Sequence, residues 1–467
     1  MINRRLMLAS GLMAGAVAAS PLRALARQST LSLDLKHALD QAVDGKLTVG
    51  GALIAVQQGR LIGEYYWGKA SLPFDRPVGP NTLFHLGSNG KLVTAVAVMQ
   101  LLRAGGISLD ATIGSLMPDL PPAIGGMRLD RLMSHTSGLP DYGEFFEDWD
   151  RPQPKANIIK AVADAPMMFE QGASFSYSNT NYLVLGWLIE HLSGMSYADY
   201  VAKRLFEPTG MPTARADASQ HVIPNRAEPY EFSPDGEAVH AVRMEDAVSR
   251  AADGGILMSA MDVAAWRHAL ASNRLLAAED WQRINSPTRL NSGRLIPYGF
   301  GTFVDQDKGR PVLHHNGGVP GFMSMWRTWP NSGLSILMMT NSMARFDQSP
   351  PFNDMIELMA EACEPGVVQP RPRLGDGTDE RTQALLKLIS RNREDPPPEG
   401  LLAVERTVAP ELVPGPLPAI EGLYPMESWM MGNSAEEGEM VRYGLTMRGR
   451  PREILVGWTP QNQIYWM

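Results

Sequence analysis

Ser88 and Lys91 form the only Ser-x-x-Lys sequence in the chain. On a helix, positions i and i+3 share a face, so the Ser88 hydroxyl and the Lys91 amine can meet within one turn. A serine at a helix start, with an amine one turn later, is typical of an activated nucleophile. The structural alternative is an N-cap serine followed by a solvated lysine. The segment after Lys91 predicts an amphipathic helix, because its apolar residues recur at helical spacing: Leu92, Val96, Met99 and Leu102.

Tyr177 and Asn179 lie together in a segment that precedes a second predicted helix, at residues 182–189. A loop tyrosine can shuttle a proton, and an amide side chain beside it can hydrogen-bond to a substrate. The alternative is a buried tyrosine that anchors the loop, with Asn179 as the N-cap of the helix.

His315, Gly317 and Gly318 stand at the end of a predicted apolar strand. Glycines at a strand end let a substrate approach the backbone closely. The backbone N–H groups of this segment could then form half of an oxyanion hole. An ordinary strand end with a glycine turn is the alternative at this point.

Apolar β-rich runs occur near both ends of the main part of the chain. Residues 49–57 and 61–68 predict a hairpin, and residues 312–315, 322–329 and 334–340 predict three later strands. The stretch from 88 to about 283 is mainly helical in pattern, and residues 353–363 predict a closing helix. We therefore expect an α/β fold in which strands from both ends form one sheet flanked by helices, with a helical lobe inserted between them.

Residues 1–26 predict an export signal rather than part of the fold. Arg4 and Arg5 form a basic start, residues 6–19 are apolar but short for a membrane span, and residues 24–26 read Ala-Leu-Ala. The paired arginines indicate the twin-arginine route, and the location is then periplasmic or secreted. A retained membrane anchor is the alternative. Cys363 is the only cysteine, so no internal disulfide can form.

The C-terminal part divides into a Pro/Gly-rich linker, 364–419, and a small β-rich segment, 420–467, which leaves 27–363 for the main domain. The formal net charge of −8 argues against binding to nucleic acid. The sequence has no cysteine cluster and no His-Glu-x-x-His, so we expect no metal site and no cofactor. The oligomeric state is left open by the sequence.

Five segments resemble motifs of one family, in the order that the family has them. Residues 84–91, Phe-His-Leu-Gly-Ser-Asn-Gly-Lys, resemble the nucleophile motif of the serine β-lactamase and penicillin-binding protein superfamily, and residues 133–140 resemble a structural signature of its class C-like branch. The others resemble the second motif, a loop-to-helix piece and the third motif: 175–179, 254–259 and 315–322. The resemblance covers about residues 47–363 and implies the β-lactamase/transpeptidase-like fold.

The resemblance also implies roles for individual residues. Ser88 would attack a carbonyl carbon, and Lys91 and Tyr177 would share the removal of its proton. Backbone N–H groups of Ser88 and Gly318 would bind the oxyanion, beside Gly317. Asn179 would orient either the substrate amide or the Lys91 side chain. His135, in the class C-like signature, is expected to be structural.

The third motif departs from the family because it begins with His315 instead of lysine. Histidine is mostly neutral above its ordinary pKa of about 6.5, so it is a weak partner for a substrate carboxylate. This favours an esterase, amidase or D-amino-acid peptidase acting on a small ester, amide or peptide. A β-lactamase or D-Ala-D-Ala carboxypeptidase is the first alternative, with Arg327 as a substitute cation. A catalytically idle cell-wall-binding protein is the second.

Overall fold

The computed structural model describes most of the chain beyond residue 31. The described residues are 32–44, 48–146, 153–216, 222–233, 235–241, 252–307, 309–343, 352–368, 373–391, 398–403, 420–431, 434–447 and 450–467. The predicted export signal, 1–26, lies outside them. Within the described part, no helix is both long and apolar enough to cross a bilayer.

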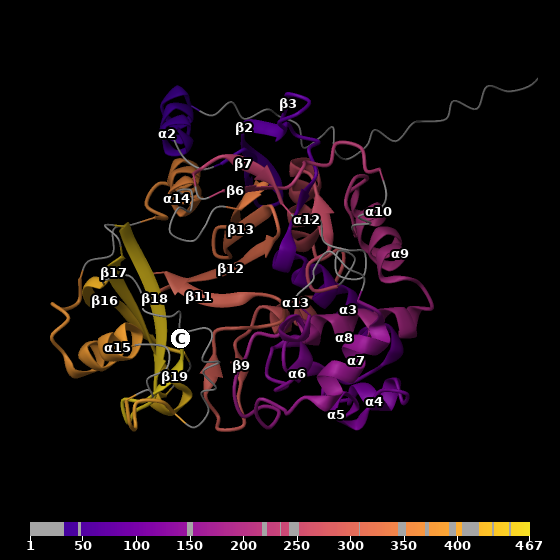
Figure 1. The fold of residues 1–467 in the computed structure, drawn as a ribbon, viewed down its shortest axis with the longest axis vertical. Coiled ribbons are helices and arrows are strands. Elements are labelled where there is room, and N and C mark those ends of the chain that lie inside the picture. Colours follow the sequence, from indigo (N-terminus) through magenta and orange to yellow (C-terminus); the bar gives the residue numbers. More distant parts are fainter. Residues whose placement is uncertain are drawn as a thin grey trace, which may run out of the picture.

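A seven-stranded antiparallel sheet forms the centre of the molecule, with the order β11-β12-β13-β14-β1-β2-β3 (Figure 1). Strand β1 pairs with β2 on one side and with β14 on the other, so the sheet joins both ends of the main domain, as predicted. The strands are β1 (Gly50–Gln57), β2 (Arg60–Ser71), β3 (Arg76–Pro77), β11 (Phe303–Asp307), β12 (Arg310–Val319), β13 (Phe322–Trp329) and β14 (Leu334–Thr340).

Helices cover both faces of this sheet because its strands are apolar on both sides. On one face, α2 (Leu33–Val43) and α14 (Phe352–Cys363) pack over β1 and β14 in a separate apolar core. On the other face, α12 (Ala260–Ala271) and the helical lobe share the largest core with the sheet. The sheet is therefore the middle layer of the main domain.

The helical lobe is inserted between β4 (Phe84–His85) and β8 (Ile256–Met258). Its centre is the pair α3 (Lys91–Gly105) and α8 (Asn179–Ser193). The prediction of an amphipathic helix after Ser88 was wrong in one respect, because α3 is buried on all sides over its first nine residues. The other lobe helices are α4 (Ile113–Leu116), α5 (Pro122–Gly125), α6 (Leu129–Met133), η2 (Tyr142–Phe145), α7 (Lys155–Asp164), α9 (Tyr197–Val201), η3 (Ala202–Phe206) and α10 (Glu207–Thr209).

Three small sheets and one more helix complete the main domain. One sheet, β4-β8-β5, supports the segment that leads into Ser88. The remaining elements are β5 (Arg215–Ala216), β6 (Tyr230–Phe232), β7 (Ala238–His240), β9 (Thr288–Arg289), β10 (Leu295–Ile296), β15 (Ser342–Met343) and α13 (Ala278–Ile284).

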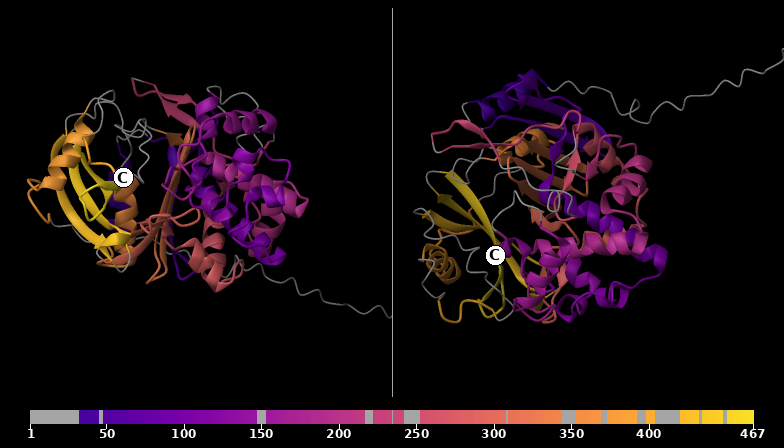
Figure 2. Two further views of the ribbon diagram at one scale, coloured as in Figure 1. Left: turned by 90° about the horizontal axis from the view of Figure 1, so that it is seen from below. Right: turned by 45° about the vertical axis from the view of Figure 1, so that its right-hand side comes forward.

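The C-terminal segment folds as a separate four-stranded sheet beside the main one (Figure 2). Helix α15 (Glu380–Ser390), which lies inside the predicted linker, packs its apolar face against this sheet and shares its core. The strands are β16 (Ile420–Met430), β17 (Glu439–Met447), β18 (Arg450–Trp458) and β19 (Ile464–Trp466), with a short turn η5 (Ala435–Glu437).

A buried ion pair joins this C-terminal sheet to the main sheet. Arg442 on β17 donates to the Asp305 carboxylate on β11 at 2.7 Å and to the backbone oxygen of Gln306 at 2.9 Å. Burial alone would raise the pKa of Asp305, but His314 and Arg442 outweigh it and hold that pKa well below its usual range. The Tyr465 hydroxyl adds a bond to the backbone oxygen of Leu295 at 3.0 Å.

Replacing Arg442 is expected to separate the two sheets. Arg442→Ala leaves the buried Asp305 carboxylate without its arginine, with His314 at 3.6 Å as its remaining ion-pair contact, so the free energy of unfolding should fall by about 3–5 kcal/mol. Arg289→Ala, which removes the more exposed ion pair to Glu437, is the matched control and should cost about 0–1 kcal/mol.

Urea unfolding of the two variants measures this difference, and equal losses would contradict it. Because Asp305 has a lower pKa in the folded protein, its ionisation stabilises the fold above about pH 4, and that contribution is lost as the pH falls further.

Candidate active site

Ser88 lies on a 3-10 turn, η1 (Gly87–Gly90), directly before helix α3. The turn is tight because Gly87 has a positive φ of 53°, and a side chain there would press on the backbone of Gly317 and Gly318. Gly90 lies against the Ile256 side chain. Ser88 is partly exposed while its neighbours in the turn are buried, so its hydroxyl is the accessible group.

The Lys91 amine is fully buried beside the Ser88 hydroxyl. Its Nζ lies 3.1 Å from Ser88 Oγ, 2.7 Å from Asn179 Oδ1 and 2.7 Å from the backbone oxygen of Asp253. Burial lowers the pKa of Lys91 to about 8, although the charges of Asp253 and Asp141 act in the opposite direction. A useful fraction of Lys91 is therefore neutral near pH 7 and able to accept a proton.

His135 fixes the loop that carries Tyr177. Its backbone oxygen accepts from Ser176 N–H at 3.0 Å, and its Nδ1 accepts from Ser178 N–H at 3.2 Å. The imidazole stacks on the Tyr177 ring with centroids 4.2 Å apart. His135 itself has a positive φ of 56° and no exposed surface. His135 therefore fixes the position of Tyr177, in agreement with the structural role expected for the signature at residues 133–140.

The Tyr177 hydroxyl is buried close to Ser88. It makes no hydrogen bond of normal geometry, while the ring lies under Lys91 with Nζ 4.9 Å from its centroid. Burial raises the pKa of Tyr177 well above its ordinary value, and the nearby Ser88 hydroxyl offsets this only in part. The Tyr177 phenol therefore keeps its proton at neutral pH. It can donate that proton, but it cannot accept another one from Ser88 until it has done so.

His315, on β12, lies beside the Tyr177 ring, on which His135 stacks. Its Nδ1 lies 2.6 Å from the Asn316 backbone oxygen and its Nε2 lies 3.2 Å from the Tyr298 hydroxyl. Burial, with a contribution from Lys91, lowers the pKa of His315 to about 3. The ring is thus neutral throughout the physiological range, and only 2% of the residue is exposed.

The glycines of the third motif bring β12 against η1, the turn that carries the predicted nucleophile Ser88 and is called the nucleophile turn below. A side chain at Gly317 would overlap the Leu86 carbonyl oxygen, whereas one at Gly318 would meet only the end of Met343. Gly318 and Asn316 are exposed and Ser88 is partly exposed, so these backbones border the open side of the site.

The structure brings together the seven predicted site residues, and it adds three that the sequence did not reveal. Tyr298 partners His315, and Asp253 and Asp141 supply buried or partly buried charge near Lys91. Asp253 directly precedes the recognised segment 254–259, and that position was its only signal. Arg327 does not replace the missing lysine, because it points to Glu357 on α14, with 3.5 Å between the charged atoms.

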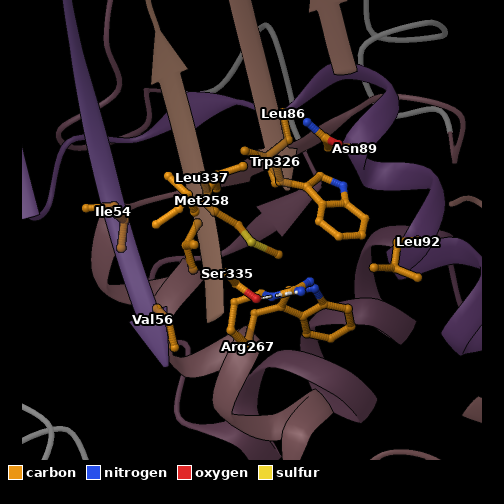
Figure 3. A pocket seen from close by; sticks show the side chains of 13 residues that line it. Ile54, Val56, Leu86, Asn89, Leu92, Met258, Arg267, Trp326, Ser335 and Leu337 are labelled. Atoms are coloured by element: carbon orange, nitrogen blue, oxygen red, sulfur yellow. Dashed lines mark hydrogen bonds between the residues drawn. The ribbon is translucent and has the colours of Figure 1, made fainter. Parts of the chain in front are cut away.

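A small cavity lies behind the nucleophile turn, between the sheet and α12 (Figure 3). Its volume is about 30 Å³, far below the several hundred Å³ of a typical ligand pocket. Asn89 and Leu86 border it, together with Arg267, which bonds to Ser335 and stacks on Trp326 at 4.7 Å. It is a packing defect of the core and too small to hold a substrate. Among the described residues, no group of His, Cys, Asp and Glu has metal-binding geometry.

The family model described as Beta-lactamase matches residues 35–356. The chain therefore belongs to the beta-lactamase family, and the predicted family and fold are confirmed. Within that family it is a serine hydrolase, in line with the relatives described next.

Two curated relatives show the range of activities nearby. A penicillin-binding protein of Bacillus subtilis is 29% identical over 323 residues, which cover 65% of this chain and 70% of that protein. A D-aminopeptidase of Gluconobacter oxydans is 26% identical over 302 residues, covering 63% of this chain and 56% of the enzyme. The chain thus matches little more than half the length of the D-aminopeptidase.

Solved structures show the same fold. A D-amino acid amidase from Ochrobactrum anthropi aligns with a TM-score of 0.62 and 23% identity, over 71% of this chain and 99% of the amidase. The octameric penicillin-binding protein homologue from Pyrococcus abyssi aligns with a TM-score of 0.61 and 19% identity, over 92% of this chain and 96% of its own. The second match extends over most of the C-terminal part of the present chain.

Alanine at Gly317 should disable the site, whereas alanine at Gly318 should be tolerated. The Gly317→Ala side chain would force β12 away from Leu86 and misplace the backbone donors beside Ser88. We expect hydrolysis to fall about 100-fold or more, as for loss of an oxyanion donor. Gly318→Ala should stay within about tenfold of wild type. Ester hydrolysis and melting temperature of both variants test this, and an equally active Gly317→Ala protein would contradict it.

Proposed function

We propose that Ser88 is the nucleophile of this hydrolase and that Lys91 is its general base. The observation that carries the proposal is the buried Lys91 amine, 3.1 Å from Ser88 Oγ with a pKa of about 8. At pH 7 about one molecule in ten then has a neutral amine, which can take the Ser88 proton as Oγ attacks the carbonyl carbon. Asn179 Oδ1 holds the amine in line during this transfer.

The later steps use the groups around the acyl carbon. Backbone N–H groups of Ser88 and Gly318 stabilise the oxyanion as it forms. The Tyr177 phenol, which keeps its proton at neutral pH, protonates the leaving group as the carbon–nitrogen or carbon–oxygen bond breaks. A water molecule then attacks the acyl-enzyme and releases Ser88. His315, with Gly317, shapes the substrate side of β12.

The substrate is best described as an amide or small peptide without a carboxylate next to the reacting group. The Lys91 amine is held by Ser88, Asn179 and Asp253, so it is not free to bind a substrate carboxylate. His315 is neutral and cannot take the place of a carboxylate-binding lysine. D-aminopeptidase and D-amino acid amidase relatives support an amidase or aminopeptidase reading over a β-lactamase. Small esters are included in the proposed range.

We further propose an exported protein with four parts. Residues 1–26 act as the signal, with a periplasmic or secreted location, and 27–363 form the hydrolase domain. Residues 364–419 connect it to the β-rich segment 420–467, although α15 in this connection belongs structurally to the C-terminal sheet.

Replacing the nucleophile should abolish covalent trapping. Ser88→Ala is expected to lose labelling by a fluorescent phosphonate and to lower hydrolysis by several orders of magnitude. Ser292→Ala, an exposed serine between β9 and β10, is the matched control and should label normally. Lys91→Ala and Tyr177→Phe should each disable acylation, with the double variant little worse than either. Near-normal turnover of Ser88→Ala would refute the assignment.

Discrimination against carboxylate-bearing substrates should not change with pH. Because the pKa of His315 is lowered to about 3, the ring gains no charge between pH 5 and 8. For a matched pair of amides with and without a terminal carboxylate, the ratio of kcat/KM should therefore stay flat over that range and favour the uncharged member. A ratio that shifts toward the carboxylate substrate as the pH falls through 6.5 would show that His315 is exposed to substrate and titrates normally.

A further inference from the structure

Asp253 carries a buried carboxylate next to the candidate active site. The proposed catalytic steps give this carboxylate no role. It lies in the segment that leads into β8, and only 7% of the residue is exposed. Its Oδ2 accepts a hydrogen bond from the hydroxyl of Tyr142 at 2.9 Å, and its backbone oxygen accepts from Lys91 Nζ at 2.7 Å. Asp253 thus contacts Lys91 through its backbone oxygen and Tyr142 through its carboxylate.

The segment around Asp253 is fixed at several points, so its carbonyl has little freedom. The hydroxyl of Thr94 on α3 donates to the backbone oxygen of Ala252 at 2.5 Å and also bonds the Tyr197 hydroxyl. Gly254 packs on the backbone of Gly87 in the nucleophile turn. Tyr142, which is 2% exposed, then anchors the Asp253 side chain. The position of the Lys91 acceptor is therefore set by contacts on both sides.

We propose that Asp253 is a positioning residue for the general base: its backbone oxygen holds the Lys91 amine, and its carboxylate, anchored by Tyr142, balances the charge that the amine gains in the reaction. This inference rests on the proposed role of Lys91. When Ser88 Oγ gives up its proton, a buried ammonium forms, and such a charge is costly unless an opposite charge lies nearby. Asp253 supplies that charge without contacting the substrate.

Carboxylates supply the negative charge around Lys91. Asp141, which receives Asn179 N–H at 2.6 Å, adds a second negative charge. The remaining titratable groups that face Lys91 are neutral near pH 7, because burial keeps the tyrosines protonated and the histidines unprotonated: Tyr177, Tyr182, His135 and His315. Burial raises the pKa of Asp253 above its ordinary value, and Lys91 and the Tyr142 hydroxyl, which favour the charged form, offset this only in part.

The direction of the effect on Lys91 follows from these charges. Burial lowers the pKa of Lys91 to about 8, and Asp253 is the largest influence that raises it. Without the carboxylate, the ammonium is less stable and the pKa of Lys91 falls further. The acid limb of the pH–rate profile for acylation should move to lower pH, while the maximal rate falls because the amine becomes a weaker base.

The test measures the rate of covalent labelling by an uncharged phosphonate ester between pH 5 and 10, in the full-length protein. Wild type should show an acid limb near pH 8. Asp253→Asn, which keeps the shape but removes the charge, should show a limb about one unit lower, so that at pH 6.5 it retains roughly tenfold more of its own maximal rate than wild type does. Tyr142→Phe is the matched control: it keeps the charge, so its limb should stay in place while its maximal rate falls.

A second variant protects the test against misfolding. Tyr142→Phe with Asp253→Ala removes both buried partners together, which leaves neither unsatisfied, and its limb should also lie below that of wild type. An unmoved limb in folded Asp253→Asn, or in the folded double variant, overturns the role of Asp253. A Ser88→Ala protein that labels as fast as wild type would instead refute the nucleophile and, with it, this inference.

Discussion

The removal of one amine from water is the condition on which the rest of this site depends. In the proposed mechanism Lys91 can act as a base only because it is buried, and burial of an amine is tolerated only when each of its protons has an acceptor. Lys91 is buried because it begins helix α3, which lies in the core, and three oxygens from separate parts of the chain accept its hydrogen bonds. The lobe, the loop before α8 and the segment before β8 all converge on this single group.

The central sheet places the other half of the site. Gly317 and Gly318 lie against the turn of Ser88 because β12 runs antiparallel to β13, and β13 in turn is aligned through β14 with β1. Close contact of two backbones is possible only where side chains are absent. Packing of glycine on glycine therefore sets the distance between the turn that carries Ser88 and the backbone of Gly317 and Gly318.

Sequence patterns were sufficient for the fold class, and the seven residues predicted for the site lie together in the structure, because each motif combines an unusual residue with a local structural constraint. Ser88, Lys91 and Tyr177 could be placed in this way. Long-range contacts could not: nothing near His315 in the sequence indicates that Tyr298 would bury its ring, and nothing near Asp253 points to Tyr142. The packing of α15 on the C-terminal sheet was equally invisible, since it depends on strands that follow it at a distance in the sequence.

The pairing of β1 with β14 has a consequence for how the protein is made. Thr340 on β14 bonds the backbone oxygen of Gly50, 290 residues earlier in the chain. During synthesis, β1 and β2 emerge as an apolar hairpin with one open edge, and their neighbour appears only after the whole helical lobe. Such an edge can pair with other chains while it waits. The early hairpin therefore keeps an unpaired edge until β14, in the last third of the domain, has been translated.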